Sequence, residues 1–395
     1  MKILASIFFA AATAVCTADI GNIKTSSTET PGILKITYEL SEPAIVMMSV
    51  KTGGVAIAES RLAHLSGDVR RKVPTGNGTI YWAADRDLGA ALPSGSEVEL
   101  TPWALDAPPE VMVVDVRMPG NFTFYRSLDG LPDGGLKNDK YRTACMVMKK
   151  IPAKGVTFLC GKTGEGVADK YKPFLCTFTN DFYFGIYPVT QAQHLMVAGT
   201  TSSEPSSDPA SHLHPVNKVN MIDLRYWSNW PQDGHNVQYR AISKWQLLGL
   251  KFDLPTSTQW EYACRAGEQG DYYNGKDASH LGEIAWYAEN SDGTTHPVGL
   301  KEPNAWDLYD MIGNVQEWTL DKYRHTEVPD RETVKVDYPG PSEHESAYSA
   351  ACTRRGGSCE TAASSCAMHM TFNYNKNAGP YTHNGYRLCV PAEIP

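Results

Sequence analysis

A short acidic segment in the second half of the chain has the residue types of a metal site. Asp310 and Glu317 stand at its two ends, with Gly313 and Val315 between them. A glycine turn between two carboxylates can aim backbone carbonyl oxygens at one point, and calcium is a hard cation that prefers oxygen ligands. The segment therefore predicts a calcium site. The alternative is that the two carboxylates only hydrogen-bond the turn.

Cysteine is the second residue type that could do chemistry. Of the nine cysteines, all but Cys16 follow residue 140. These eight are Cys145, Cys160, Cys176, Cys264, Cys352, Cys359, Cys366 and Cys389. In an exported chain an even number favours disulfides over free thiols, although the spacing leaves the pairing open. The Cys-x-x-Cys spacing does not occur, so we do not expect a structural zinc site.

The N-terminus predicts export. Lys2 is followed by an apolar run and then by small residues up to Ala18, the pattern of a secretory signal peptide cleaved after Ala18. A lipoprotein, with Cys16 as the lipidated residue, is the alternative, and the bulky Val15 before it fits poorly. Later apolar stretches are too short to span a bilayer. We expect a periplasmic, cell-surface or extracellular protein.

Length and charge narrow the class of protein. A chain of 395 residues with 42% hydrophobic residues favours two globular domains. The formal net charge is −8, without a long basic run, so nucleic acid is not an expected partner.

The elements that must position these residues fall into two regions. Residues 19–117 alternate short β-type runs with turn residues, which predicts an immunoglobulin-like or fibronectin-like β-sandwich. Residues 118–142 are rich in Gly, Pro and Asp and are expected to be a linker. The second domain would then occupy residues 143–395. Its clearest predicted helix follows Pro255, and another is expected to begin near Thr190.

Six strings in the second region carry a family resemblance. They are FYFGIYPVTQAQ (182–193), HPVNKVNMIDLRYW (214–227), FDLPTSTQWEYACRAG (252–267), HPVGLKEPNAWDLYDMIGNVQEW (296–318), RRGGS (354–358) and NGYRL (384–388). In this order they resemble the formylglycine-generating enzyme family, also called sulfatase-modifying factors. The resemblance implies an α+β, C-type-lectin-like fold with little regular secondary structure. It also implies a calcium ion at four positions, held by the side chains of Asp310 and Glu317 and by the backbone carbonyls of Gly313 and Val315.

The resemblance breaks down at the residues that would oxidise a substrate cysteine. Enzymes of this family use copper held by two thiolates, at the third and eighth positions after Gly-Gly-Ser. Here those positions are Thr361 and Cys366. A threonine hydroxyl cannot replace a thiolate for the soft copper(I) ion. We therefore expect a non-catalytic role in binding or surface assembly. The alternative is an active, copper-loaded oxidoreductase in which Cys359 and Cys366 form a displaced pair.

Two further expectations come from the resemblance. Relatives without the catalytic pair keep cysteines at the positions of Cys264 and Cys366, which implies a disulfide between them. The family's peptide groove would be lined by Asn373, Tyr374, Asn375, Tyr381 and His383. The expected partner is a protein or peptide, with a cell-surface glycan as the other class.

Overall fold

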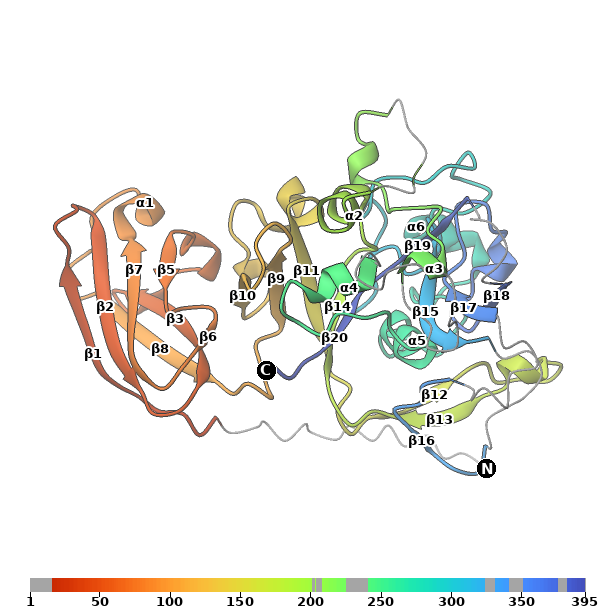
Figure 1. Cartoon of the computed structure of the whole chain (residues 1–395), viewed down its shortest axis with the longest axis horizontal. Coiled ribbons are helices and arrows are strands. Elements are labelled where there is room, and N and C mark those ends of the chain that lie inside the picture. Colours follow the sequence, from red (N-terminus) through yellow and green to blue (C-terminus); the bar gives the residue numbers. More distant parts are fainter. Residues whose placement is uncertain are drawn as a thin grey trace. The chain divides into compact units, whose positions relative to one another are not determined.

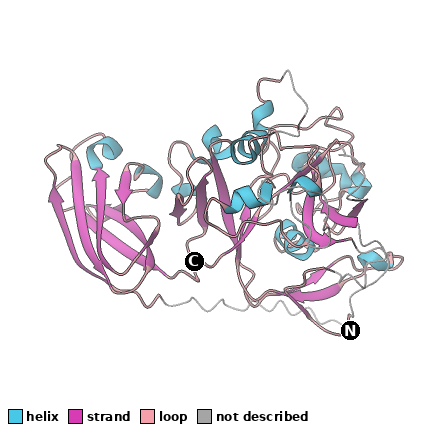
Figure 2. Ribbon diagram, viewed as in Figure 1, coloured by secondary structure: helices cyan, strands magenta, loops and turns pink. Residues whose placement is uncertain are grey.

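The computed structural model describes residues 16–200, 203, 208–224, 241–323, 331–340, 351–375 and 382–394. The predicted signal peptide lies almost entirely outside the described residues, so export stays a prediction. The chain forms two compact units, Met1–Pro109 with Glu393–Pro395, and Glu110–Ala392. Both are built mainly of strands, with few and short helices (Figure 2).

The first unit contains two antiparallel sheets (Figure 1). One has the order β1-β2-β7-β5, and the other has the order β4-β3-β6 with β8 also paired to β3. The bounds are β1 Ile20–Ser27, β2 Ile33–Leu40, β3 Ala44–Thr52, β4 Val55–Ala56, β5 Leu65–Gly67, β6 Lys72–Val73, β7 Gly76–Ala83 and β8 Glu97–Trp103. A short helix, α1, spans Ala84–Leu88.

Alternation along these strands builds the core of the first unit. Ile36 on β2 pairs with Ile80 on β7, and both are fully buried. Trp82 on β7 and Val46 and Met48 on β3 belong to the same hydrophobic cluster. Because residues two apart share a face of a strand, each sheet presents one apolar face. This β-rich unit is consistent with the expected sandwich, and the immunoglobulin-like topology stays a prediction.

The second unit holds three sheets with the orders β10-β9-β11-β14-β20, β12-β13-β16 and β18-β17-β15-β19. The strands are β9 Val111–Asp115, β10 Phe122–Tyr125, β11 Cys145–Ile151, β12 Thr157–Cys160, β13 Phe174–Thr177, β14 Phe182–Gly185, β15 Gln316–Lys322, β16 Lys335–Val336, β17 Ala351–Arg355, β18 Phe372–Asn375, β19 Asn384–Tyr386 and β20 Cys389–Pro391.

The boundary between the units differs from the expected one. We expected residues 111–116 to close the sandwich, but β9 lies between β10 and β11 in the second unit. Val111 and Val113 are buried in that unit's hydrophobic cluster. The expected linker, 118–142, contains β10 and three 3-10 helices, Leu128–Gly130, Gly135–Lys137 and Asp139–Arg142. Strand alternation predicts a strand without indicating which sheet it joins, and this explains the difference.

The helices of the second unit are short. They are α2 Gln191–Ala198, α3 Met221–Leu224, α4 Ala241–Gln246, α5 Ser257–Arg265 and α6 Leu281–Ile284. The predicted helix after Pro255 is confirmed as α5, with the capping box of Thr256 and Gln259. The helix expected near Thr190 is confirmed as α2. Among the described residues, none of the helices combines the length and apolar character needed to cross a membrane.

Candidate functional site

The loop at residues 356–366, here called the Gly-Gly-Ser loop, follows β17 directly. Gly356 and Gly357 both have positive φ, 88° and 73°. A Cβ on Gly357 would lie 2.9 Å from the Cys366 Sγ. Only glycine allows this backbone and this approach, so the loop brings its own backbone against Cys366.

Thr361 and Cys366 occupy the two positions of the family's thiolates. The Thr361 Oγ1 accepts a hydrogen bond from the Ser358 N–H at 2.9 Å and lies 3.1 Å from the Ser358 Oγ. The threonine hydroxyl thus ties the loop to itself. Cys366 is fully buried, and burial raises the pKa of its thiol to about 12. At neutral pH this sulfur is a protonated thiol, which is a poor nucleophile and metal ligand.

Cys359, the other member of the displaced pair, is held by its backbone. Its N–H donates to the Asn314 carbonyl at 3.0 Å, and its carbonyl accepts from the Ser291 hydroxyl at 2.5 Å. Burial, reinforced by Glu360, raises the pKa of its thiol to about 12. Cys366 belongs to the large hydrophobic cluster of the second unit, whereas Cys359 does not. The two thiols therefore have different surroundings.

The expected disulfide between Cys264 and Cys366 is not formed. Every one of the nine cysteines, all of which lie among the described residues, is a free thiol. Cys264 lies on the buried face of α5, and both thiols belong to the same hydrophobic cluster. A buried thiol packs as a small apolar group, so the apolar setting accounts for both cysteines without a bond between them.

The carboxylates predicted to bind calcium have nitrogen donors as partners. The Glu317 Oε1 accepts from the Arg387 Nη2 at 2.8 Å, and its Oε2 accepts from the Trp260 indole at 2.7 Å. The Asp310 Oδ2 accepts from the Gly299 N–H at 2.7 Å. Burial raises the pKa of Asp310.

A cation at Glu317 would lie beside a buried guanidinium, so this donor set does not suit calcium as it stands. Val315 is buried, and Gly313 lies so close to Trp286 that a Cβ would meet its carbonyl oxygen at 2.2 Å. Among the described residues, no group of three or more His, Cys, Asp or Glu is arranged to hold a metal. Calcium at the four positions stays a prediction.

The residues of the predicted groove are only partly described. Tyr381 lies outside the described residues, and of Tyr374 and Asn375 only the backbone, in β18, is described. Asn373 is exposed, and its carbonyl accepts from the Arg354 Nη2 at 2.9 Å. His383 is buried, with its Nε2 3.2 Å from the Glu360 Oε1. His383 therefore reaches the Gly-Gly-Ser loop.

Sequence reasoning missed two polar residues beside His383. Gln316 on β15 pairs with Asn384 on β19, so their side chains share a face. The Gln316 N–H donates to the His383 carbonyl at 2.9 Å. Four buried atoms here have no hydrogen-bond partner: the Gln316 Oε1, the Asn384 Nδ2 and both ring nitrogens of His383, of which the Nε2 only approaches Glu360. We call these three residues the groove cluster. Both missed residues lie in strings that carry the family resemblance, Gln316 in 296–318 and Asn384 in 384–388, but nothing local marks them as neighbours.

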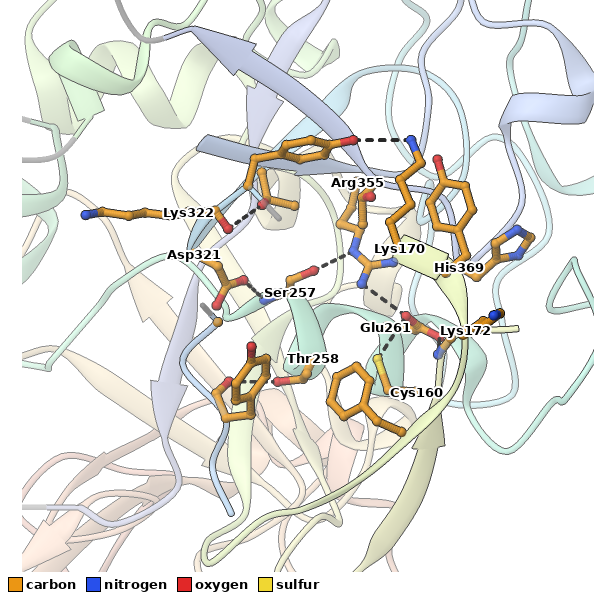
Figure 3. Close-up of a pocket in the computed structure, with 18 residues that line it drawn as sticks. Cys160, Lys170, Lys172, Ser257, Thr258, Glu261, Asp321, Lys322, Arg355 and His369 are labelled. Carbon is orange, nitrogen blue, oxygen red and sulfur yellow. Dashed lines mark hydrogen bonds and ion pairs between the residues drawn. The ribbon is translucent and has the colours of Figure 1, made fainter. Parts of the chain in front are cut away.

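A separate cavity of about 60 Å³ lies on the other side of β17 (Figure 3). We call it the Asp321 cavity. Its lining residues are Cys160, Gly161, Lys170, Tyr171, Lys172, Phe174, Ser257, Thr258, Glu261, Asp321, Lys322, Tyr323, Tyr338, Gly340, Thr353, Arg355, His369 and Thr371. None of these lining residues is among the predicted calcium, copper or groove residues.

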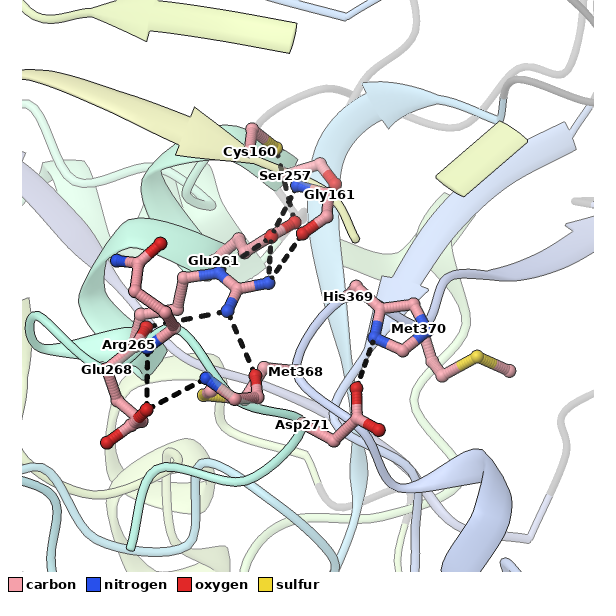
Figure 4. A network of polar contacts seen from close by, with 12 residues as sticks. Cys160, Gly161, Ser257, Glu261, Arg265, Glu268, Asp271, Met368, His369 and Met370 are labelled. Carbon is pink, nitrogen blue, oxygen red and sulfur yellow. Dashed lines mark hydrogen bonds and ion pairs between the residues drawn. The ribbon is translucent and has the colours of Figure 1, made fainter. Parts of the chain in front are cut away.

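Glu261, which lines the Asp321 cavity, lies at the centre of a buried ion network, and Figure 4 shows its contact with Arg265. Glu261 contacts Arg265 at 2.8 Å and Arg355 at 3.0 Å, and all three side chains are at most 5% exposed. Although burial opposes ionisation, the two arginines lower the pKa of Glu261 to about 2. Burial instead raises the pKa of Asp321, which also lines the cavity, to about 7. One cavity thus holds two carboxyl groups with opposite shifts.

These sheets, short helices and the Gly-Gly-Ser loop define an α+β domain of the formylglycine-generating-enzyme type. The family model described as the sulfatase-modifying factor enzyme 1-like domain (FGE-sulfatase) matches residues 142–391. The chain belongs to this family.

Several known proteins are similar to parts of this chain. It is 26% identical over 212 residues to the chaperone protein LppX of Paenibacillus barcinonensis, covering 41% of this chain and 74% of that protein. It is 38% identical over 171 residues to the formylglycine-generating enzyme of Mycobacterium tuberculosis, covering 35% of this chain and 53% of that enzyme. The match thus spans about half of the enzyme. The solved structure of Treponema denticola variable protein 1 superposes with a TM-score of 0.50 at 25% identity, over 64% of this chain and 96% of that one.

Proposed function

We propose that the second unit is a non-catalytic binding domain whose ligand is a protein or peptide. The observation that carries this proposal is the groove cluster. A buried polar atom without a partner costs about 1–3 kcal/mol, so four of them on these three neighbouring residues favour a ligand that supplies their bonds. A peptide backbone offers both N–H donors and C=O acceptors. It could donate to the Gln316 Oε1 and accept from the Asn384 Nδ2.

Thr361 supports the non-catalytic part of the proposal. Its hydroxyl is used within the loop, and Cys366 is a buried, protonated thiol. The chain is also similar to a protein named as a chaperone, a class of protein whose ligands are proteins. A cell-surface glycan is the other class of ligand that the polar groove would suit.

Cysteine oxidation is the second candidate function. It is favoured by the presence of Cys359 and Cys366 in one loop and by the 38% identity to a formylglycine-generating enzyme. It would require both buried thiols to become exposed and ionised.

The binding proposal is tested by selecting a random peptide library displayed on phage against the immobilised full chain. Selected peptides should bind Gln316→Leu roughly tenfold more weakly, because one hydrogen bond in a buried site is lost. Gln269→Leu, at an exposed position, is the matched control and should bind as the wild type. Failure to enrich any peptide, or equal binding to both variants, would contradict the proposal.

The oxidase candidate is tested separately. The reduced, copper-loaded protein is incubated with a Cys-x-Pro-x-Arg peptide, and mass spectrometry follows conversion of the cysteine to formylglycine. We expect no conversion. Conversion that Cys366→Ser abolishes would establish the enzyme and reject the non-catalytic part of the proposal.

A further inference from the structure

The Asp321 cavity is assembled from segments far apart in the sequence. Asp321 comes from the end of β15, Arg355 from β17, and Ser257 and Glu261 from α5. His369 and the ends of β12 and β13 complete the wall. The fold thus converges on a space that side chains do not fill (Figure 3).

One wall carries a surplus of positive charge. Glu261 is the single carboxylate between Arg265 (Figure 4) and Arg355 (Figure 3). Two guanidinium groups against one carboxylate leave one positive charge in a buried setting, where an uncompensated charge is costly. Only Arg355 of the two arginines lines the cavity.

The guanidinium of Arg355 retains one N–H for a ligand. Its Nε donates to the Ser257 hydroxyl at 2.7 Å, and its Nη2 donates to Glu261 at 3.0 Å. Its Nη1 donates to the carbonyls of Met368 and Met370 at 3.1 and 3.4 Å. Arginine has five N–H donors, so these contacts use four of them.

Asp321, which also lines the cavity, carries an acceptor without a partner. The residue is buried, with an exposed fraction of 3%. Its Oδ2 accepts from the Ser257 N–H, whereas its Oδ1 is buried without any hydrogen-bond partner. Gly340 keeps space beside this oxygen, because a Cβ there would come within 2.9 Å of the Oδ1.

Ser257 links Asp321 to Arg355. Its amide N–H donates to Asp321 and its hydroxyl accepts from Arg355, so the acceptor and the cationic donor both lie beside this one residue. A ligand that matches both groups needs an anionic group facing Arg355 and a hydrogen-bond donor facing the Asp321 Oδ1.

We propose that the Asp321 cavity binds a small zwitterion of the α-amino-acid type, with its carboxylate toward Arg355 and its ammonium toward the Asp321 Oδ1. The volume of about 60 Å³ suits the smallest members of this class. Such a ligand is neutral overall, so it adds no net charge to the cavity.

This cavity is distinct from the groove cluster. Successive residues of a strand point to opposite faces of a sheet. Arg354 contacts Asn384 at 2.6 Å, on the groove side, whereas Arg355 faces the cavity. A failure of peptide binding at the groove would therefore leave the amino-acid proposal standing, and a failure of glycine binding at the cavity would leave the peptide proposal standing.

The test uses three matched probes on the full chain. Glycine carries both groups, acetate lacks the ammonium, and methylamine lacks the carboxylate. Binding is measured by saturation-transfer NMR at neutral pH. Glycine should bind roughly tenfold or more tightly than either single-ended probe, because each end contributes a charge-assisted hydrogen bond.

Two variants locate the glycine site. Asp321→Asn removes the acid, and Thr371→Phe fills the cavity without changing its charge. Each should weaken glycine binding by roughly tenfold or more. Lys276→Gln, at an exposed lysine outside the cavity, should bind glycine as the wild type does. Glycine binding that matches acetate binding, or that survives Thr371→Phe, would overturn the proposal.

Discussion

Glu261 is the residue on which the charge pairing inside the second unit depends. It also accepts from the Gly161 N–H at 2.7 Å and lies 3.2 Å from the Cys160 Sγ. Replacing it by glutamine leaves Arg265 and Arg355 buried without a counter-charge. We predict that Glu261→Gln lowers the free energy of unfolding by about 3–5 kcal/mol, as measured by urea unfolding followed by tryptophan fluorescence.

An exposed ion pair provides the control for this prediction. Glu283 contacts Lys276 at 2.6 Å, with both side chains well exposed to solvent. Such pairs contribute little, so Glu283→Gln should change the unfolding free energy by no more than about 0.5 kcal/mol. A similar effect of both substitutions would contradict the role given to Glu261.

Asp321 is predicted to make stability depend on pH in the opposite sense to Glu261. Its pKa in the folded protein is about 7, against 3.8 for an ordinary aspartate. The folded state therefore holds this proton more tightly than the unfolded state does. The protonated Asp321 makes its full contribution to the free energy of unfolding below pH 3.8, and this contribution is lost as the pH rises through 7. Between pH 5 and pH 7 the loss should be about 1 kcal/mol per pH unit.

The measurement compares the unfolding free energy of wild type and Asp321→Asn at pH 5 and pH 7. The variant has no proton to lose, so its decline across this range should be smaller. Equal declines in the two proteins would show that Asp321 titrates normally.

At the scale of elements, the turn before β15 is fixed by close backbone contact between Gly313 and Trp286. Gly313 has a φ of 78°, and a Cβ there would lie 2.2 Å from the Trp286 carbonyl oxygen. Gly293 has a similar φ of 69° with nothing within 4 Å. Gly293→Ala should thus cost only the strain of the left-handed backbone, about 1–2 kcal/mol.

We predict that Gly313→Ala destabilises the second unit clearly more than Gly293→Ala does. The added methyl group forces the turn away from Trp286 and disturbs the start of β15, which carries Gln316 and Glu317. Thermal unfolding of both variants measures the difference. Equal losses would mean that this contact is loose.

The sequence predicted individual elements well where the signal is local. Thr256 and Gln259 predicted the start of α5, because a capping box involves only neighbouring residues. The β9 strand was also predicted, but its sheet was not, because pairing depends on partners distant in sequence. The Asp321 cavity could not be predicted for the same reason, because Asp321 and Arg355 are far apart in the sequence and are brought together by the fold.

The candidate site was predicted only where a family motif marked it. Thr361 could be recognised as the missing thiolate by counting from Gly-Gly-Ser. The groove cluster could not, since Gln316 and Asn384 become neighbours only through the parallel pairing of β15 with β19. The disulfide expected from relatives was wrong because both thiols pack as apolar groups.

At the scale of the whole molecule, the position of β9 decides where the second unit can be separated. We predict that residues 110–392 fold alone and unfold cooperatively, whereas residues 143–392 do not. The shorter chain lacks β9, which pairs with β11 over Cys145 to Lys149 and buries Val111 and Val113. Near-ultraviolet circular dichroism and urea unfolding distinguish the two. If residues 143–392 were as stable as residues 110–392, this prediction would be wrong, and residues 118–142 would be a linker that the second unit does not need.

The adjacent arginines on β17 have a practical consequence for genetics. Arg354 contacts Asn384 beside the groove and Arg355 contacts Glu261 beside the cavity, so β17 acts as a partition with one cation on each side. Substitutions at Arg354 and at Arg355 therefore affect two separate sites, the groove cluster and the Asp321 cavity. A mutational scan of this strand should give phenotypes that alternate from one position to the next, instead of merging into a single sensitive patch.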